Sequence, residues 1–222
     1  MPLSVRAVRH RYSDRHPWVL RGLDLEIADG SSVALMGPSG SGKTTLLSVL
    51  GLLTQPTEGQ VAIDGAPVTA ASRAAGQIRA EQFSWVFQTA NALLRRSALE
   101  NASLQLLARG LGRRSAEQVA LEELERLGMG ALVGRRCRLL SGGELQRVCI
   151  ARALAAAPRW ILADEPTGQL DHTTTLDVVD ALIDGRPVGT SVIIATHDAE
   201  VAGRCGRVLR LLDGTIQSDT GR

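Results

Sequence analysis

The chain has 222 residues, a formal net charge of +2 and a hydrophobic fraction of 44%, values typical of a soluble globular protein with one large or two small domains. The small excess of positive charge gives no argument for nucleic acid, and an aromatic fraction of 3% leaves few rings on which single strands could stack. We therefore expect a protein without a nucleic-acid partner.

Neither the cysteines nor the apolar segments indicate a metal centre, a disulfide scaffold or a membrane span. Cys137, Cys149 and Cys205 lie far apart and show no metal or redox spacing, so we expect three reduced thiols in a cytosolic protein. No apolar run approaches the ~20 residues of a membrane helix, and the first ten residues lack the apolar core of a signal peptide. If the protein acts at a membrane, we expect a partner protein to attach it there.

The first part of the chain predicts short strands around one helix. Alternating or continuous apolar residues indicate the strands, and a helix-forming run follows the third of them. A later stretch has the pattern of a β-hairpin with Asp64 and Gly65 at its tip. The expected strands are residues 3–9, 23–27 and 31–36, the helix is about 44–53, and the hairpin is 60–68.

The middle of the chain changes character after an expected strand at 83–87. The sequence becomes helical and rich in arginine, and apolar residues recur close to the helical period between 115 and 127. Capping-box spacing occurs twice, at Ser97 with Glu100 and at Ser115 with Gln118. These features predict a helical subdomain.

The last part predicts three buried strands, at 160–164, 191–196 and 207–212, separated by helical or polar stretches. Strands that alternate with helices favour a mainly parallel sheet. We therefore expect residues 1–222 to form one α/β domain. Residues 1–88 and 151–222 are the expected core, and residues 89–150 are the expected helical insertion.

A glycine-rich segment at 37–44 follows a buried strand, precedes a helix, and matches the phosphate-loop pattern G-x-x-x-x-G-K-[ST] at every position. Its glycines let backbone N–H groups turn toward phosphates, and the following helix N-terminus adds positive dipole charge. Lys43 is the only lysine of the chain. We expect it to reach the β- and γ-phosphates, and we expect Thr44 to offer its hydroxyl to Mg²⁺. The expected nucleotide-binding residues here are Gly37, Pro38, Ser39, Gly40, Ser41, Gly42, Lys43, Thr44 and Thr45.

The strand at 160–164 leads into two adjacent carboxylates, Asp164 and Glu165. Its apolar residues carry Asp164 to the C-terminal end of the strand, where a carboxylate can orient Mg²⁺ or its waters. Glu165 then points to the space from which water attacks a γ-phosphate. One acidic residue after a strand is commonly a helix N-cap. Two carboxylates in a chain with a phosphate loop favour the metal and catalytic roles instead.

The stretch LLSGGELQR, residues 139–147, places Ser141, Gly142 and Gly143 before a helix expected to run to about residue 157. Glu144 lies in its first turn. The exposed backbone donors of that helix start could form a second anion-binding site. The alternative is an ordinary helix with a serine cap.

With this stretch the chain resembles the ATP-binding subunit of an ABC transporter, whose signature is Leu-Ser-Gly-Gly-Gln or a close variant. Leu140 to Gly143 match the signature, and Glu144 is a frequent variant at the fifth place. The resemblance covers nearly the whole chain. It implies a P-loop NTPase fold with a mainly parallel core sheet, an N-terminal antiparallel β-subdomain and an inserted α-helical subdomain.

Four further positions carry the resemblance. Tyr12 sits where the family has an aromatic that stacks on adenine, although an exposed aromatic in a turn is the alternative. Gln88 matches the glutamine that senses Mg²⁺ and abuts the membrane partner. Residues 169–171 match the D-loop with Asp171 in place, although glutamine replaces the commoner asparagine or alanine. His197 matches the switch histidine. The other histidines, His10, His16 and His172, match no motif and are expected at the surface.

The resemblance implies a site shared by two copies of the chain packed head to tail. Ser141, Gly142, Gly143 and Glu144 of one copy would then cap the γ-phosphate held by the other. Glu165 would polarise the attacking water, and His197 would hold the γ-phosphate. The implied cofactor is Mg²⁺ with ATP as substrate, and its expected ligands are Thr44, Gln88 and Asp164.

Within the family, the motifs resemble a group of lipoprotein-releasing, macrolide-export and antimicrobial-peptide-resistance ATPases and the related cell-division ATPase. Arg95-Arg96 and the stretch Arg135-Arg136-Cys137-Arg138 stand where that group usually has prolines, and Leu145 replaces a usual glutamine. These departures concern the surface toward the permease.

The expected function is an ATPase subunit that powers a separately encoded integral membrane permease, held peripherally on the cytoplasmic face of the inner or plasma membrane. The alternative is an ABC ATPase without transport, which transmits force through a membrane partner to a cell-wall hydrolase. A small-molecule kinase with the same phosphate loop is disfavoured by the signature and the D-loop.

Overall fold

The computed structural model describes residues 2–168 and 172–221. The strands are β1 (Leu3–His10), β2 (Leu20–Ile27), β3 (Ser32–Met36), β4 (Glu58–Ile63), β5 (Ala66–Val68), β6 (Phe83–Val86), β7 (Trp160–Asp164), β8 (Ser191–Thr196), β9 (Arg207–Leu212) and β10 (Thr215–Gly221). The α-helices are α1 (Lys43–Leu50), α2 (Arg73–Gln82), α3 (Ala98–Ala102), α4 (Leu104–Ala108), α5 (Arg113–Arg126), α6 (Gly142–Ala155), α7 (His172–Ile183) and α8 (Ala199–Arg204).

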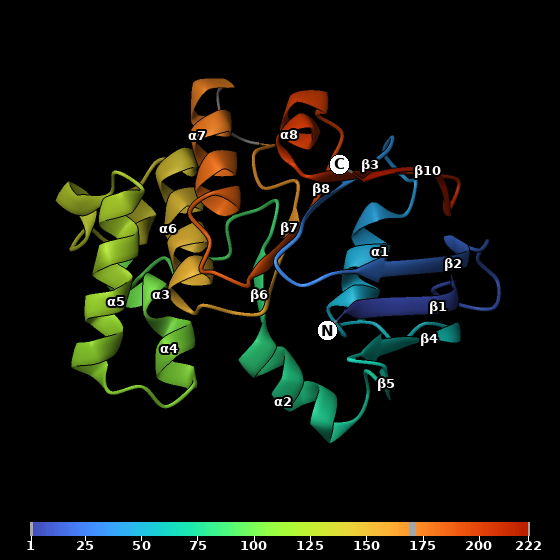
Figure 1. Ribbon diagram of the computed structural model, residues 1–222. Coiled ribbons are helices and arrows are strands. Elements are labelled where there is room, and N and C mark those ends of the chain that lie inside the picture. Colours follow the sequence, from blue (N-terminus) through green and yellow to red (C-terminus); the bar gives the residue numbers. More distant parts are fainter. Residues whose placement is uncertain (1, 169–171, 222) are drawn as a thin grey trace.

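Two sheets organise these elements (Figure 1). The larger has six strands in the order β10-β9-β3-β8-β7-β6, and every pairing in it is parallel except that of β9 with β10. The smaller has four antiparallel strands in the order β2-β1-β4-β5. The expected α/β fold, with a mainly parallel core sheet and an N-terminal antiparallel sheet, is confirmed.

The core sheet is covered on both faces, which explains the continuous apolar runs of its central strands. Leu35, Leu162 and Ile193 pack with α1 and with the antiparallel sheet. Their neighbours along the strands, such as Ile161 and Ile194, pack with α6, α7 and α8 instead. Helix α1 therefore lies between the two sheets (Figure 1).

Helix α1 ends at Leu50, three residues before the expected end. A β-carbon on Gly51 would lie 2.2 Å from the Trp85 ring, so only glycine allows the helix end to approach that ring. Leu52 then takes a positive φ of 58° and turns the chain away. Helix α1 is short because its C-terminal end packs directly on Trp85 of β6.

Two elements were not expected from the sequence. Helix α2 buries only Ala75, so its sequence shows no apolar stripe. Strand β10 is polar and lies at the sheet edge, where an apolar pattern is not required.

Of the two expected capping boxes, one is confirmed and one is wrong. The Ser97 hydroxyl accepts a bond from the Glu100 N–H, and the Glu100 carboxylate accepts one from the Ser97 N–H. Ser115 is not a cap, because α5 already begins at Arg113 after Gly112.

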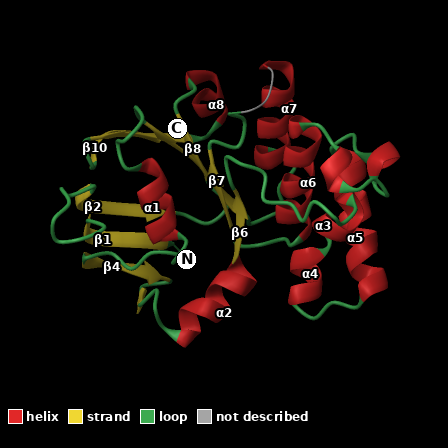
Figure 2. Ribbon diagram, turned by 180° about the vertical axis from the view of Figure 1, so that it is seen from behind, coloured by secondary structure: helices red, strands yellow, loops and turns green. Residues whose placement is uncertain are grey.

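Helices α3, α4, α5 and α6 gather on the side of the core sheet opposite the antiparallel sheet, as the view from behind shows most clearly (Figure 2). Helix α4 is bound to the core through Gln105, which donates to the Phe83 carbonyl at 2.8 Å and accepts from the Ser84 hydroxyl at 2.8 Å. Helix α6 runs across residue 150, where the sequence placed the subdomain boundary. The division into core and helical insertion stays a prediction.

Within the described part of the chain, no helix combines the length and apolar character that a membrane crossing requires.

The three cysteines are free and buried, with exposed fractions of 1% for Cys137, 1% for Cys149 and 2% for Cys205. Burial raises the pKa of the Cys137 and Cys205 thiols to about 11 and also raises the pKa of Cys149. Because the thiolate is the reactive form, we predict that none of the three reacts with Ellman's reagent in the native protein at mildly alkaline pH. All three should react after unfolding in guanidinium chloride. A fast-reacting thiol in the native protein would contradict this packing.

Candidate functional site

Five separated stretches of the sequence line one cavity of about 590 Å³. Strands β3, β7 and β8 run parallel, so their C-terminal ends meet at one edge of the sheet, where ligands bind in open α/β sheets. The residues that line the cavity are Val19, Pro38, Ser39, Gly40, Gly42, Lys43, Thr44, Thr45, Gln88, Glu165 and His197. All of them except Val19 were expected from the sequence as nucleotide-site residues.

The phosphate loop connects β3 to α1 and turns sharply at Gly42, whose φ of 103° only glycine adopts without strain. Lys43 is 7% exposed and folds back over the loop. Its Nζ donates to the Gly37 carbonyl at 2.8 Å and to the Pro38 carbonyl at 3.2 Å. The ammonium is thus held inside a ring of loop backbone, beside the first turn of α1.

Asp164 and Thr44 form an oxygen pair that fits a hard divalent cation. The Thr44 hydroxyl donates to Asp164 Oδ1 at 3.1 Å. Burial raises the pKa of the Asp164 carboxyl, against the opposing effect of the hydrogen bond from Thr44. Hydroxyl and carboxylate oxygens are ligands that Mg²⁺ accepts. Gln88 lines the same cavity as Thr44 and carries a side-chain amide oxygen of the kind that can join this pair.

Glu165 lies between the Lys43 ammonium and the His197 imidazole. Its Oε1 lies 3.9 Å from Lys43 Nζ, and both of its carboxylate oxygens lie 3.0 Å from His197 Nδ1. Because a carboxylate only accepts, the geometry requires a proton on Nδ1. The Glu165 side chain is 15% exposed, whereas that of His197 is 71% exposed.

The Glu165 backbone is strained, with a φ of 44°. Its N–H donates to the Ala195 carbonyl of β8 at 2.9 Å, which holds this conformation in place. A positive φ at a non-glycine residue costs about 1–3 kcal/mol and is concentrated at functional sites. The strain aims the carboxylate into the cavity directly after the end of β7.

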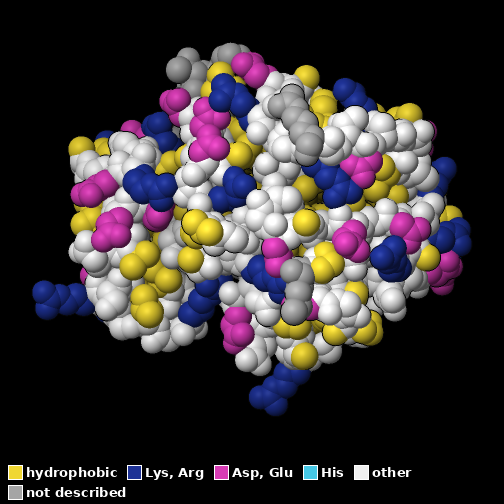
Figure 3. Space-filling view, in the orientation of Figure 1, with side chains coloured by type: hydrophobic (Ala, Val, Ile, Leu, Met, Phe, Trp, Pro, Cys, Tyr) yellow, Lys and Arg dark blue, Asp and Glu magenta, His cyan; other side chains and the backbone are white. Residues whose placement is uncertain are grey.

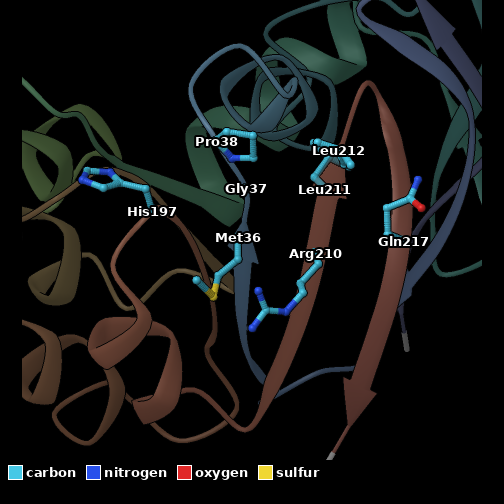
Figure 4. A pocket seen from close by; sticks show the side chains of 8 residues that line it. All are labelled: Met36, Gly37, Pro38, His197, Arg210, Leu211, Leu212 and Gln217. Atoms are coloured by element: carbon cyan, nitrogen blue, oxygen red, sulfur yellow. The ribbon is translucent and has the colours of Figure 1, made fainter.

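A second cavity, of about 400 Å³, adjoins the first (Figure 4). Met36 from β3 and Arg210 from β9 lie side by side in it, and Gln217 reaches it from β10. Pro38 and His197 line both cavities. The His197 ring is therefore accessible from two sides.

The segment from Ser141 to Glu144 does not line the cavity of its own chain. Ser141 caps α6 in a reciprocal capping box: its hydroxyl accepts from the Glu144 N–H at 3.3 Å, and the Glu144 carboxylate accepts from the Ser141 N–H at 2.7 Å. That second bond is the largest cause of the lowered pKa of Glu144. Gly142 and Gly143 are in the first turn, where helix N–H groups have no intrahelical partner. Helix capping and free donors are thus present together.

Helix α6 also holds the segment that carries Gln88. The Gln146 side chain donates to the Phe87 carbonyl at 3.1 Å. Arg152 binds the backbone carbonyl and the side-chain oxygen of Asn91. Neither residue was expected from the sequence, because no motif marks a side chain whose partner is a backbone group far away in the sequence.

Tyr12 is 65% exposed and lies beside the phosphate loop, with its hydroxyl 2.8 Å from Thr45 Oγ1. His16 is exposed as expected. The surface expectation for His10 is wrong, since His10 is 6% exposed. Asp171 and the rest of the 169–171 segment lie outside the described residues.

Acidic and basic side chains are interspersed over the face in Figure 3.

Three comparisons with known proteins identify relatives of one kind. A family model described as "ABC transporter" matches residues 20–168. The lipoprotein-releasing system ATP-binding protein LolD of Cereibacter sphaeroides is 48% identical over 200 residues, which cover 89% of each chain. The macrolide export ATP-binding/permease protein MacB of Rhodospirillum rubrum is 44% identical over 207 residues, 91% of this chain and 32% of MacB. A solved dimeric ATP-binding cassette in a post-hydrolysis state with ADP and Pi is 33% identical, with a TM-score of 0.87 and coverage of 99% and 98%.

Proposed function

Because the chain belongs to the ABC transporter family as an ATP-binding and ATP-hydrolysing subunit, we propose that it powers a separately encoded membrane permease through ATP-dependent pairing of two copies. Relatives named ATP-binding proteins match along about nine-tenths of their own length, which supports a separate permease. Their names support lipoprotein release as the process. Such a subunit would sit on the cytoplasmic face of the membrane through its permease.

The pairing of two copies is supported by one observation, that the cavity of a single copy lacks the Ser141–Glu144 segment. Gly142 and Gly143 are at a helix N-terminus, where backbone donors and the helix dipole favour an anion. They do not line the cavity of their own chain, whereas that cavity is open beside His197. A second copy packed head to tail would bring Ser141, Gly142, Gly143 and Glu144 onto the γ-phosphate. The dimeric form of two similar solved cassettes supports this arrangement.

The phosphate end of ATP would lie in the loop from Gly37 to Thr45. Lys43 can turn its ammonium from the two loop carbonyls to the β- and γ-phosphates without leaving the cavity. Thr44, Asp164 and Gln88 would hold Mg²⁺, which neutralises phosphate charge when bound. Tyr12 would receive the adenine ring on its face, since it is exposed next to Thr45.

Glu165 would accept a hydrogen bond from the attacking water and take its proton as the water oxygen bonds to the γ-phosphorus and the bond from that phosphorus to the bridging oxygen of the departing ADP breaks. His197 holds the Glu165 carboxylate in place, and because it lines the same cavity its ring would contact a γ-phosphate oxygen there. Chemistry of this kind depends on positioning and charge stabilisation more than on covalent steps. The short, fixed Glu165–His197 contact supplies both.

Coupling to the membrane partner would run through Gln88. Gln146 and Arg152 of α6 bind backbone on either side of Gln88. A movement of α6, caused by a γ-phosphate at its N-terminus, would therefore displace the Gln88 segment. Helix α6 would thereby connect the nucleotide bound by the second copy to the surface that is expected to meet the permease.

We predict that Glu165→Gln lowers the rate of ATP hydrolysis at least about 100-fold, because proton transfer by a positioned carboxylate is lost. ATP binding should remain, because the amide removes no phosphate ligand. Steady-state phosphate release and size-exclusion chromatography with ATP measure the two effects, and the dimer should accumulate. Glu125→Gln, on the exposed face of α5, is the control. Hydrolysis at the unaltered rate by Glu165→Gln would remove Glu165 from the mechanism.

A mixing experiment tests the shared site. We predict that Ser141→Arg and Lys43→Ala are each inactive alone, since the first blocks the capping segment and the second removes the phosphate ligand. A mixture of the two should recover part of the ATPase activity, because the loop of the Ser141→Arg copy then faces the intact segment of the Lys43→Ala copy. A mixture as inactive as its components would show that both elements act within one chain.

A further inference from the structure

The orientation of Tyr12 needs an explanation, because burial does not fix it. The ring lies in the turn between β1 and β2 and is 65% exposed. Its hydroxyl lies 2.8 Å from Thr45 Oγ1. Because the hydroxyl oxygen lies on the axis of the Cβ–Cγ bond, this contact does not stop the ring from rotating about that bond. If an exposed ring that stacks on a base is disordered before binding, the free-energy cost of ordering it lowers the affinity for the base. A ring that is already held in position avoids this cost.

The backbone of the turn is fixed on both sides. The Arg11 N–H donates to the Thr57 hydroxyl at 3.2 Å, and that hydroxyl approaches the Arg11 carbonyl at 3.3 Å. The guanidinium groups of Arg9 and Arg11 lie 4.0 and 4.6 Å from the centre of the Trp18 ring. These contacts place the α-carbon of Tyr12 but not the plane of its ring.

His10 contacts the ring itself. It ends β1, is 6% exposed, and meets Tyr12 in a T-shaped arrangement with ring centres 5.1 Å apart and an interplanar angle of 87°. On its other side, His10 Nδ1 lies 3.5 Å from Thr57 Oγ1. Burial lowers the pKa of His10, with an opposing contribution from the Gln55 backbone, so the ring is neutral at pH 7. The imidazole thus lies between Thr57, in the turn before β4, and the Tyr12 ring.

We propose that His10 is the positioning residue for nucleotide-base binding, in that its ring holds Tyr12 upright beside the phosphate loop, a role that rests on the proposed function of Tyr12 as the adenine platform. The contacts of the His10 ring are with Tyr12 and Thr57, neither of which belongs to the phosphate loop. Loss of the His10 ring therefore weakens binding of the base and leaves the phosphate site and the turnover step intact.

The experiment compares two probes, MgATP and magnesium tripolyphosphate, which has phosphates and no base. Both are titrated by calorimetry into the full chain carrying His10→Leu, which fills a similar volume without an aromatic edge. The affinity for MgATP should fall about threefold to tenfold, the size of one aromatic contact. The affinity for tripolyphosphate and the kcat of ATP hydrolysis should stay unchanged. His16→Ala, an exposed histidine on the same turn, is the matched control and should match the unaltered protein with both probes.

Rescue and coupling separate positioning from folding. His10→Phe restores an aromatic edge and should bind MgATP within about twofold of the unaltered protein. In a Tyr12→Ala background, His10→Leu should have no further effect. If His10→Leu does not fold, His10→Gln takes its place as the non-aromatic variant.

Four results would overturn the proposal. They are unaltered MgATP affinity in a folded His10→Leu protein, equal weakening with both probes, failure of His10→Phe to rescue, and additive effects of the two variants. Unaltered MgATP affinity in Tyr12→Ala would overturn the platform role as well. A weakened Tyr12→Ala with an unaffected His10→Leu leaves the platform role standing and removes His10 alone.

Discussion

The site depends on the parallel pairing of β3, β7 and β8. In this pairing Met36 lies opposite Thr196, and Asp164 lies opposite Ala195, so the phosphate loop, the two carboxylates and His197 begin at the same edge of the sheet. The core strands are buried on both faces, which makes this register costly to change. A slip of one residue would move Glu165 away from the Ala195 carbonyl and from His197.

The register also accounts for the strained backbone at Glu165. The strand ends at Asp164, whose side chain reaches Thr44. The next residue must point toward His197 and Lys43, and an ordinary extended backbone would send it to the opposite face of the sheet. The positive φ at Glu165 solves this conflict, and the bond to Ala195 stabilises it. Two adjacent carboxylates thereby reach two different partners, Asp164 the Thr44 hydroxyl and Glu165 the His197 ring.

The sequence predicted the core strands, the phosphate loop and the carboxylate pair because each has a local pattern: an apolar run, fixed glycine spacing, or acidic residues directly after a strand. Helix α2 and strand β10 were missed because their stability comes from packing that leaves no apolar period. The same limit explains Gln146 and Arg152, whose partners are backbone groups distant in sequence. His10 was placed at the surface because a histidine at the end of a strand carries no signal of what covers it.

We expect the Lys43 ammonium, which donates to two carbonyls of its own loop, to be the phosphate ligand of the cavity. Since Lys43 is the only lysine, reductive methylation labels it and the terminal α-amino group, and the α-amino group serves as internal reference. Quantitative mass spectrometry with and without MgATP is the most direct test. The account predicts that MgATP suppresses methylation of Lys43 relative to the α-amino group. Equal labelling of Lys43 at saturating MgATP would contradict it.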